Sequence, residues 1–223
     1  MPSRPYVLLS CAVSLDGCLD DTTAQRLVLS GPADLDRVDA ERAGCDAILV
    51  GAGTVRRDDP RLEVRSDVRR AARVAAGRSP SPLRVVLTRG GGLDPGARLF
   101  TSGTAARLVF CTTPELPRTR VRLGAVAEVA DAGPAGDLDR VLADLAGRGV
   151  RRLMVEGGSA VLTDFLDAGL ADELQLAVAP LLVGDPRAPR FLGAPAPRRA
   201  RLLDLRPVGD AALLRYALSE RAS

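Results

Sequence analysis

The chain has 223 residues, of which 46% are hydrophobic and 26% charged, and its 31 basic and 28 acidic residues give a formal net charge of +3. This composition is that of an ordinary globular protein, long enough to bury a core without disulfides or a structural metal. Histidine is absent, which excludes His-dependent nucleophiles and His-ligated metal sites; we expect no metal. The small net charge and scarce aromatic residues argue against nucleic-acid binding.

The four cysteines, Cys11, Cys18, Cys45 and Cys111, have neither a redox nor a metal-ligand spacing. We expect buried free thiols in a reducing compartment. No stretch approaches the roughly 20 consecutive apolar residues of a membrane span, and the N-terminus lacks a signal segment. These observations predict a cytoplasmic protein that does not bind membranes.

Apolar runs bounded by turn residues alternate with helical patterns, which predicts an α/β fold with a largely parallel sheet. In the first half we expect strands at 6–13, 46–50 and 83–88, a turn at 14–17 and a helix at 32–43. Residues 57–82 are polar and weakly periodic, so we predict a long loop with room for one helical turn.

In the second half we expect strands at 107–111, 126–129, 153–155, 173–179, 201–207 and 211–218, with a hairpin turn at Gly209-Asp210. Helices are predicted from Asp137 as N-cap through Leu145, and from Ser159 as N-cap through Ala168. The chain has no internal repeat and no shift in composition, which predicts one domain over 1–223.

Two segments share a pattern: a buried strand, then glycines, then a hydroxyl residue that opens a helix. The glycines concerned are Gly51, Gly53, Gly157 and Gly158, followed by Thr54 and Ser159. Glycine permits close approach of a phosphate to the backbone, and a helix N-terminus presents unpaired N–H groups to it. Neither segment is a Rossmann fingerprint, and ordinary turn chemistry explains such glycines equally well.

Four charged residues stand at positions where chemistry is plausible. Arg89 follows a predicted strand and would suit an adenosine 2′-phosphate, although a solvated surface Arg is the plain alternative. Asp58 begins an Asp-Asp-Pro turn and is a candidate for proton chemistry. Glu156 is placed at the carboxyl end of a strand or caps the next helix, and Arg42 lies on a predicted core-facing stripe, where it would pair with an Asp or hold an anionic substrate.

Several motifs occur in a fixed order along the chain: Ser14 to Gly17, Asp46 to Val55, Asp58 to Leu62 with Arg65, Val155 to Gly158, and Leu170 to Leu174 followed by Ala179-Pro180. Together they resemble the reductase domain of riboflavin biosynthesis, a dihydrofolate-reductase-like family, over about residues 5–218. The resemblance implies a mixed, mostly parallel sheet flanked by helices with a C-terminal antiparallel hairpin, and a homodimer.

The activity implied by this resemblance is NADPH-dependent reduction of a phosphoribosylamino-pyrimidine to its ribitylamino form. A hydride would reach C1′ of an imine while the nitrogen acquires a proton, and the protein would position two ligands and exclude water. Because the chain has no His and no room for a zinc deaminase domain, we expect a reductase alone.

The resemblance also implies roles for residues. Cofactor-contacting positions are occupied by Val13, Gly51, Gly53, Thr54, Asp58, Arg89, Gly157, Gly158, Ser159, Ala160, Val161 and Leu162, in a helix start that extends to Asp164. Substrate-contacting positions are occupied by Ser10, Arg42, Leu62, Arg65 and Glu156, with the arginines suited to the sugar phosphate. Asp58, or a bound water, is the candidate proton relay, and Glu156 the candidate partner of the pyrimidine amines.

Three positions depart from the family pattern: Ser10 stands where a Lys is frequent, and Arg26 and Val28 replace residues that are commonly polar and aromatic. They leave open a reductase of the same fold acting on a pterin-like or secondary-metabolite substrate. A non-catalytic nucleotide-binding protein on a reductase scaffold is the third hypothesis.

Overall fold

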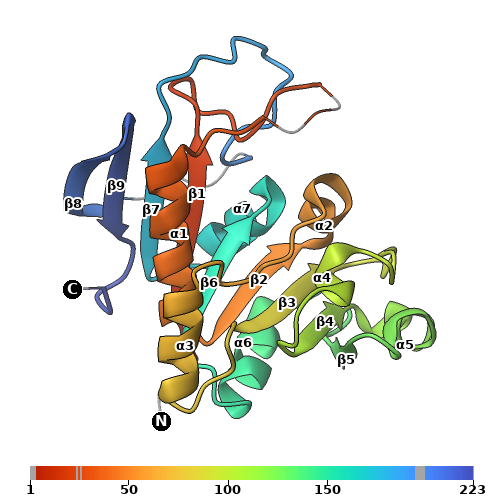
Figure 1. Cartoon of the computed structure of the whole chain (residues 1–223). Coiled ribbons are helices and arrows are strands. Elements are labelled where there is room, and N and C mark those ends of the chain that lie inside the picture. Colours follow the sequence, from red (N-terminus) through yellow and green to blue (C-terminus); the bar gives the residue numbers. More distant parts are fainter. Residues whose placement is uncertain (1–3, 24, 26, 194–198, 223) are drawn as a thin grey trace. The chain divides into compact units, whose positions relative to one another are not determined.

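The computed structural model describes residues 4–23, 25, 27–193 and 199–222, so Arg26 lies outside the described residues. In this part of the chain nine strands form a mixed, mostly parallel sheet in the order β5-β4-β3-β2-β6-β1-β7-β9-β8. The strands are β1 (Tyr6–Val13), β2 (Ala47–Gly51), β3 (Leu83–Thr88), β4 (Arg107–Cys111), β5 (Glu128–Asp131), β6 (Arg152–Gly157), β7 (Glu173–Val178), β8 (Arg201–Val208) and β9 (Ala211–Ala217) (Figure 1).

The helices of the described chain alternate with these strands through most of the sequence. They are α1 (Pro32–Gly44), α2 (Ala52–Asp58), α3 (Asp67–Ala75), α4 (Arg98–Thr101), α5 (Leu116–Leu123), α6 (Leu138–Gly147) and α7 (Ser159–Asp167), with a 3₁₀ turn, η1, at Thr113–Glu115. The sequence-based prediction of an α/β fold with a C-terminal hairpin is confirmed. None of the described helices is long and apolar enough to cross a bilayer.

The described chain divides into two compact units. One holds Asp39–Met154 with the residues before Tyr6, and the other holds Tyr6–Val38 and the residues from Val155 onward. The domain arrangement over 1–223 stays a prediction.

In the first unit, β2, β3, β4 and β5 pair in parallel, with Val50 opposite Val86 and Val86 opposite Val109. Residues in register share a face of the sheet, so these valines line one continuous apolar surface. Helices and loops add Val55, Leu62, Leu99, Phe100 and Leu123 to the same core. This packing places the carboxyl ends of β2 and β3 at one edge of the unit.

In the second unit, β1 pairs with β7 in parallel, and β7, β9 and β8 continue as antiparallel neighbours (Figure 1). The predicted turn at Gly209-Asp210 joins β8 to β9, and Gly209 has φ +61°, a conformation that favours glycine. Asp172 is fully buried and accepts hydrogen bonds from the Val7 N–H at 2.8 Å and the Ser219 hydroxyl at 2.7 Å. These contacts connect the start of β1 to the end of the chain.

The predicted loop at 57–82 is wrong in part, because α3 lies within it. Its N-cap is Ser66, whose side chain accepts a hydrogen bond from the Arg69 N–H. The buried side chain of α3 is Arg73 rather than an apolar residue, so no apolar stripe reveals the helix. Arg73 donates to the carbonyls of Ala43 and Cys45, each at 2.8 Å, which satisfies groups at the C-terminal end of α1.

Three further details differ from the sequence-based prediction. Gly158, not Ser159, is the N-cap of α7, and no side chain caps this helix. The strand expected at 126–129 runs over Glu128–Asp131, because Val126 and Ala127 form a turn onto the Leu123 carbonyl. The helices α4 and α5 were not predicted; both are short, and short helices give weak periodicity.

Candidate functional site

The carboxyl edge of the first unit brings together two predicted cofactor segments. Gly51 pairs with Leu87, so α2, which begins directly after β2, and Arg89, which follows β3, leave neighbouring parallel strands at the same edge. Gly53 is exposed, and no atom lies within 4 Å of the position that a Cβ would take there. The backbone at Gly53 is therefore open to close approach by a ligand.

The loop after β3 is held by threonine hydroxyls. Thr112 Oγ1 donates to the Arg89 carbonyl at 2.8 Å, and the Gly91 N–H donates to Thr88 Oγ1 at 3.1 Å. Gly91 has φ +60°, and a Cβ there would lie 2.1 Å from Thr119 Oγ1. Gly90 and Gly92 face open space, and Arg89 is exposed. The loop thus exposes the Arg89 side chain and the backbone at Gly90 and Gly92, while hydrogen bonds hold its backbone at Arg89 and Gly91.

The start of α7 carries the predicted cofactor residues of the second unit. Gly157 has φ +120°, and the peptide bond between Gly157 and Gly158 is cis. Because no side chain caps the helix, its first N–H groups are available to an anion. Val161 and Leu162 are buried in the unit, so any ligand contact from this turn comes from backbone and from the half-exposed Ser159 and exposed Ala160.

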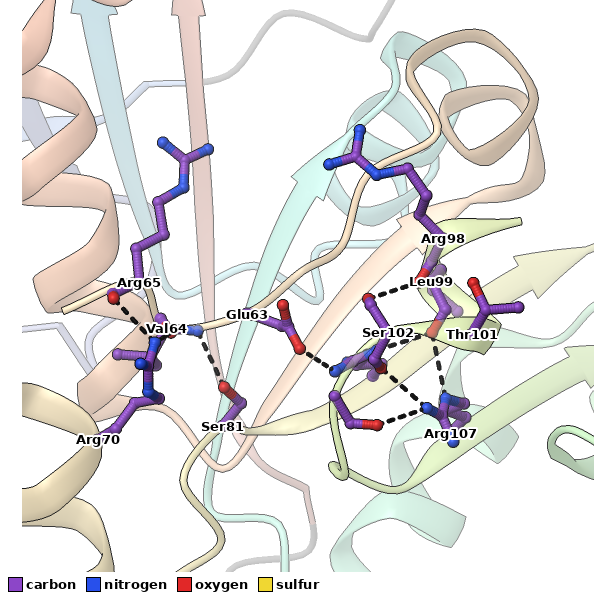
Figure 2. A network of polar contacts seen from close by, with 12 residues as sticks. Glu63, Val64, Arg65, Arg70, Ser81, Arg98, Leu99, Thr101, Ser102 and Arg107 are labelled. Carbon is purple, nitrogen blue, oxygen red and sulfur yellow. Dashed lines mark hydrogen bonds and ion pairs between the residues drawn. The ribbon is translucent and has the colours of Figure 1, made fainter. Parts of the chain in front are cut away.

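The predicted substrate residues of the first unit converge on the segment between Leu62 and Arg65. Leu62 is buried in the first core with φ +51°, so its side chain packs against protein. Arg42, half-buried on α1, donates from Nη1 to the Glu63 carbonyl at 3.1 Å. Arg65 is exposed, and Figure 2 shows its guanidinium extending away from the backbone contacts of the segment.

The buried guanidinium of Arg84 binds this segment through Glu63. Arg84 is 0% exposed; its Nη2 donates to Glu63 Oε1 at 2.8 Å and its Nη1 to the Leu99 and Ser102 carbonyls (Figure 2). Burial lowers the pKa of Arg84 while the neighbouring Glu63 carboxylate raises it, and the net direction is downward. A Cβ on Gly103 would lie 1.9 Å from Glu63 Oε1, so only glycine fits against this ion pair.

The predicted residues of the second unit lie on strands. Ser10 is buried in β1 opposite Gln175 of β7, and Val13 ends β1 opposite Val178. Glu156 is half-buried near the end of β6, directly before the glycines that precede α7. The sequence-based placement of Glu156 at the carboxyl end of a strand is therefore confirmed, whereas its contact with substrate stays a prediction.

Asp58 lies at the last residue of α2 rather than in the loop that was predicted to start there. Asp59 follows as the C-cap with φ 40°, and its Oδ1 accepts the Arg98 N–H at 2.7 Å. Asp58 is half-buried. The hydrogen bond from Arg98 thus connects the Asp-Asp-Pro turn to α4. Asp58 and Gly51 lie at opposite ends of α2.

Asp39, Glu63 and Arg84 were missed by the sequence analysis. A lone Arg inside the apolar run of β3 is a signal for Arg84, because a charge on a buried strand needs a partner. Asp39 precedes Arg42 by three residues, a spacing that places both on one side of α1. No local pattern marks Glu63.

The cysteines of the chain are free thiols. All four are free, and Cys18, Cys45 and Cys111 are buried, as expected. Burial raises the pKa of the Cys111 thiol, which keeps it protonated near neutral pH.

The site chemistry fits a nicotinamide dinucleotide better than a covalent mechanism. Each unit by itself carries features that bind phosphate groups. The first unit has the open glycine backbone at Gly53, Gly90 and Gly92 and the exposed Arg89, and the second has the uncapped start of α7. Such a ligand supplies redox chemistry that the side chains themselves do not.

Comparison with known proteins identifies relatives over nearly the full chain. The model of the family described as RibD C-terminal domain matches residues 5–214. A protein of Archaeoglobus fulgidus named 2,5-diamino-6-ribosylamino-4(3H)-pyrimidinone 5′-phosphate reductase is 37% identical over 210 residues, covering 93% of this chain and 95% of its own.

Solved structures agree with this result. RibD of Acinetobacter baumannii superposes with a TM-score of 0.80 at 26% identity, covering 97% of this chain, which spans only 58% of that larger protein. Dihydrofolate reductase of Enterococcus faecalis shares the fold, with a TM-score of 0.53 at 11% identity over 95% of each chain. The fold is therefore dihydrofolate-reductase-like, and fold and relatives together indicate a nicotinamide cofactor.

We predict that Gly91→Ala lowers the free energy of unfolding by about 1–3 kcal/mol because of its positive φ, with a further loss from overlap with Thr119. The measurement is urea denaturation of the wild type and the variant. Gly92→Ala is the matched control, since a Cβ there meets nothing within 4 Å; its effect should stay within about 0.5 kcal/mol.

The overlap is tested by a double-mutant cycle. Thr119→Ala removes the hydroxyl that a Cβ at position 91 would strike, so Gly91→Ala should cost less in that background than in the wild type. Equal costs in both backgrounds would contradict the proposed contact.

Proposed function

The chain belongs to the RibD C-terminal domain family, and on that premise we propose that it is the NADPH-dependent reductase that acts on 2,5-diamino-6-ribosylamino-4(3H)-pyrimidinone 5′-phosphate in riboflavin biosynthesis. It is an oxidoreductase, as its named relatives are. The observation that carries the proposal is the similarity to the Archaeoglobus reductase over 93% of this chain. We also propose that residues 1–223 form a single reductase domain and that the protein is cytoplasmic.

The reaction requires two ligands to meet in a fixed orientation. When bound, NADPH would supply a hydride to C1′ of the ring-opened imine and leave as NADP⁺, and the imine nitrogen would take a proton. The chain contributes positioning and exclusion of water. We assign the cofactor to two sets of residues, one in each unit. In the first unit these are Gly51, Gly53 and Thr54, and in the second they are Val13, Gly157 and the α7 start from Gly158.

We assign Arg89 to the adenosine 2′-phosphate. Its side chain is exposed while its carbonyl is held by Thr112 at 2.8 Å, so the backbone from which it extends is fixed. A guanidinium binds phosphate oxygens through two parallel hydrogen bonds. This residue would distinguish NADPH from NADH.

The phosphorylated pyrimidine is assigned to the remaining residues. Arg42 and Arg65 hold the sugar phosphate, because both guanidinium groups belong to the Leu62 to Arg65 segment or bind it directly. Leu62 is assigned to the substrate in the first unit. In the second unit we assign Ser10 and Glu156 to the pyrimidine, with the Glu156 carboxylate as acceptor for its amino groups. Asp58, or a water that it binds, relays the proton to the imine nitrogen.

We propose further that two copies of the chain associate through the face of β7, β9 and β8. Leu202 pairs with Tyr216 and Leu205 with Leu214, because a bulge between Leu202 and Asp204 restores an even spacing. Residues in register share a face, so one side of these strands carries Leu174, Leu176, Leu214, Tyr216, Leu202 and Leu205.

Exposure on this face rises toward the edge strand. Leu174 is 8% exposed, whereas Leu202 is 51% and Leu205 59% exposed. Contiguous exposed apolar residues at a sheet edge are typical of an interface. A second copy would cover them.

The activity itself is tested by the oxidation of NADPH, followed by absorbance, with the diamino pyrimidine phosphate as substrate. Arg65→Ala should raise KM for the pyrimidine about 10- to 150-fold, since a charged hydrogen bond contributes about 1.5–3 kcal/mol. The matched control is Arg118→Ala on α5, an exposed Arg, which should leave both KM values unchanged. Wild-type protein that oxidises NADPH with dihydrofolate but not with the pyrimidine would refute the proposed substrate.

Cofactor choice provides a separate prediction. Arg89→Ala should raise KM for NADPH about tenfold or more while leaving KM for NADH nearly unchanged, because only NADPH carries the 2′-phosphate. For Arg89→Lys, KM for NADPH should lie between the wild-type value and the Arg89→Ala value. Equal changes in KM for NADPH and for NADH would show that Arg89 does not bind the 2′-phosphate.

The dimer is tested by sedimentation velocity over a range of protein concentrations. Leu205→Asp should shift the protein toward monomer, because a carboxylate would then be buried at the interface. Val121→Asp, at a position 91% exposed on α5, should leave the distribution unchanged. A wild-type monomer at all concentrations would contradict the proposal.

A further inference from the structure

Asp39 of α1 binds the backbone at the residue that we assign to the substrate phosphate. Its carboxylate accepts hydrogen bonds from the Arg65 N–H and, at 3.1 Å, from the Ser66 N–H, and it forms an ion pair with Arg69 Nη1 at 3.0 Å. The Asp39 side chain is only 4% exposed. Burial alone would raise its pKa, but the hydrogen bonds from Arg65 and Ser66 and the Arg69 charge lower it overall, so it is an anion near neutral pH.

The backbone around Arg65 is held at consecutive residues. Glu63 is bound through its carbonyl by Arg42 and through its carboxylate by Arg84. The Val64 N–H donates to Ser81 Oγ at 3.0 Å, and Arg70 donates to the carbonyls of Val64 and Arg65. Asp39 completes this set at the amide of Arg65. The Arg65 side chain extends away from these contacts (Figure 2).

Asp39 and Arg42 act on this segment from neighbouring positions of one helix. They are three residues apart on α1, and side chains with this spacing lie on the same side of a helix. Arg42 binds the Glu63 carbonyl, and Asp39 binds the Arg65 amide two residues further on. One helical turn therefore sets the distance between the Arg42 guanidinium and the backbone that carries Arg65.

We propose that Asp39 is a positioning residue for the substrate phosphate, which fixes Arg65 relative to Arg42 so that both guanidinium groups meet one phosphate. The inference rests on the proposed function. Arg65 is long and exposed, so without a fixed backbone its guanidinium would sample many positions and lose binding energy to conformational entropy. Asp39 does not touch substrate in this account; it acts through Arg65.

The structure contains a matched control for a purely structural role. Asp46 Oδ2 also accepts two successive backbone N–H groups, those of Arg151 at 2.9 Å and Arg152 at 3.0 Å. Asp46 precedes β2, at the opposite end of that strand from Gly51. Asp46→Asn therefore removes the same kind of carboxylate contact without touching the Leu62 to Arg65 segment.

The test compares Asp39→Asn with Asp46→Asn in the full chain. For Asp39→Asn we expect KM for the pyrimidine phosphate to rise about tenfold, with KM for NADPH changed less than about twofold. The inhibition constant of ribose 5-phosphate, a probe for the phosphate site alone, should rise by a similar factor. Asp46→Asn should lower the melting temperature comparably and leave all three constants unchanged.

The possible outcomes separate the positioning role of Asp39 from the proposed function. If wild-type protein turns over the pyrimidine but Asp39→Asn retains its KM and its inhibition by ribose 5-phosphate, the positioning role is wrong and the proposed function stands. If the wild type neither reduces the pyrimidine nor binds ribose 5-phosphate, the proposed function and this inference both fail. Equal rises in the KM values of both substrates would indicate a general structural role.

A second variant covers the case in which Asp39→Asn does not fold. Arg69→Gln removes the ion pair to Asp39 but leaves the carboxylate on the Arg65 and Ser66 amides. We expect a smaller rise, about threefold, in KM for the pyrimidine and in the ribose 5-phosphate inhibition constant. Unchanged constants in Arg69→Gln, together with an unfolded Asp39→Asn, would overturn the proposal.

Discussion

A buried guanidinium must find acceptors within the protein, and the first unit is arranged around this constraint at Arg84. Two separate segments meet its side chain: the loop at Glu63, and α4, at Leu99 and at its C-cap residue Ser102. Since an unpaired buried charge is strongly unfavourable, these segments cannot move independently of β3. The segment that carries Arg65 is thereby connected to β3, which ends beside Arg89, so two of the three arginines that we assign to phosphate groups extend from backbone tied to the same strand.

All basic residues of the chain are arginines, and the structure divides them by what their guanidinium groups contact. Arg73, Arg84 and Arg107 donate to backbone carbonyls, where the planar group with several N–H donors satisfies more than one acceptor at once. Arg65 and Arg89 extend from backbone that other residues hold in place. The first group stabilises the scaffold, and the second group is positioned by it.

The strands and the strand-end glycines were predictable from sequence because their signals are local. Apolar runs marked β1, β3 and β4 with the observed bounds, and the glycines after β2 and β6 drew attention to the correct positions. By contrast, α3 escaped prediction because it buries Arg73 instead of an apolar stripe. The role of Asp39 depends on a partner 26 residues away in sequence, and no period or motif within either segment records that contact. The ordered motifs were needed to assign a reaction to residues that physical patterns alone left ambiguous.

The bulge in β8 determines which side chains of this strand share one face of the sheet. Leu203 is the extra residue between two paired neighbours, and removing it would return the strand to strict alternation. Leu202 and Leu205 would then be two positions apart in a regular strand and would still point to the same side of the sheet. A single-codon deletion of Leu203 would in this way keep the apolar surface intact, because the bulge is what places two leucines three residues apart on one side. Among homologous chains, a one-residue gap at this bulge should therefore be compatible with the same apolar face.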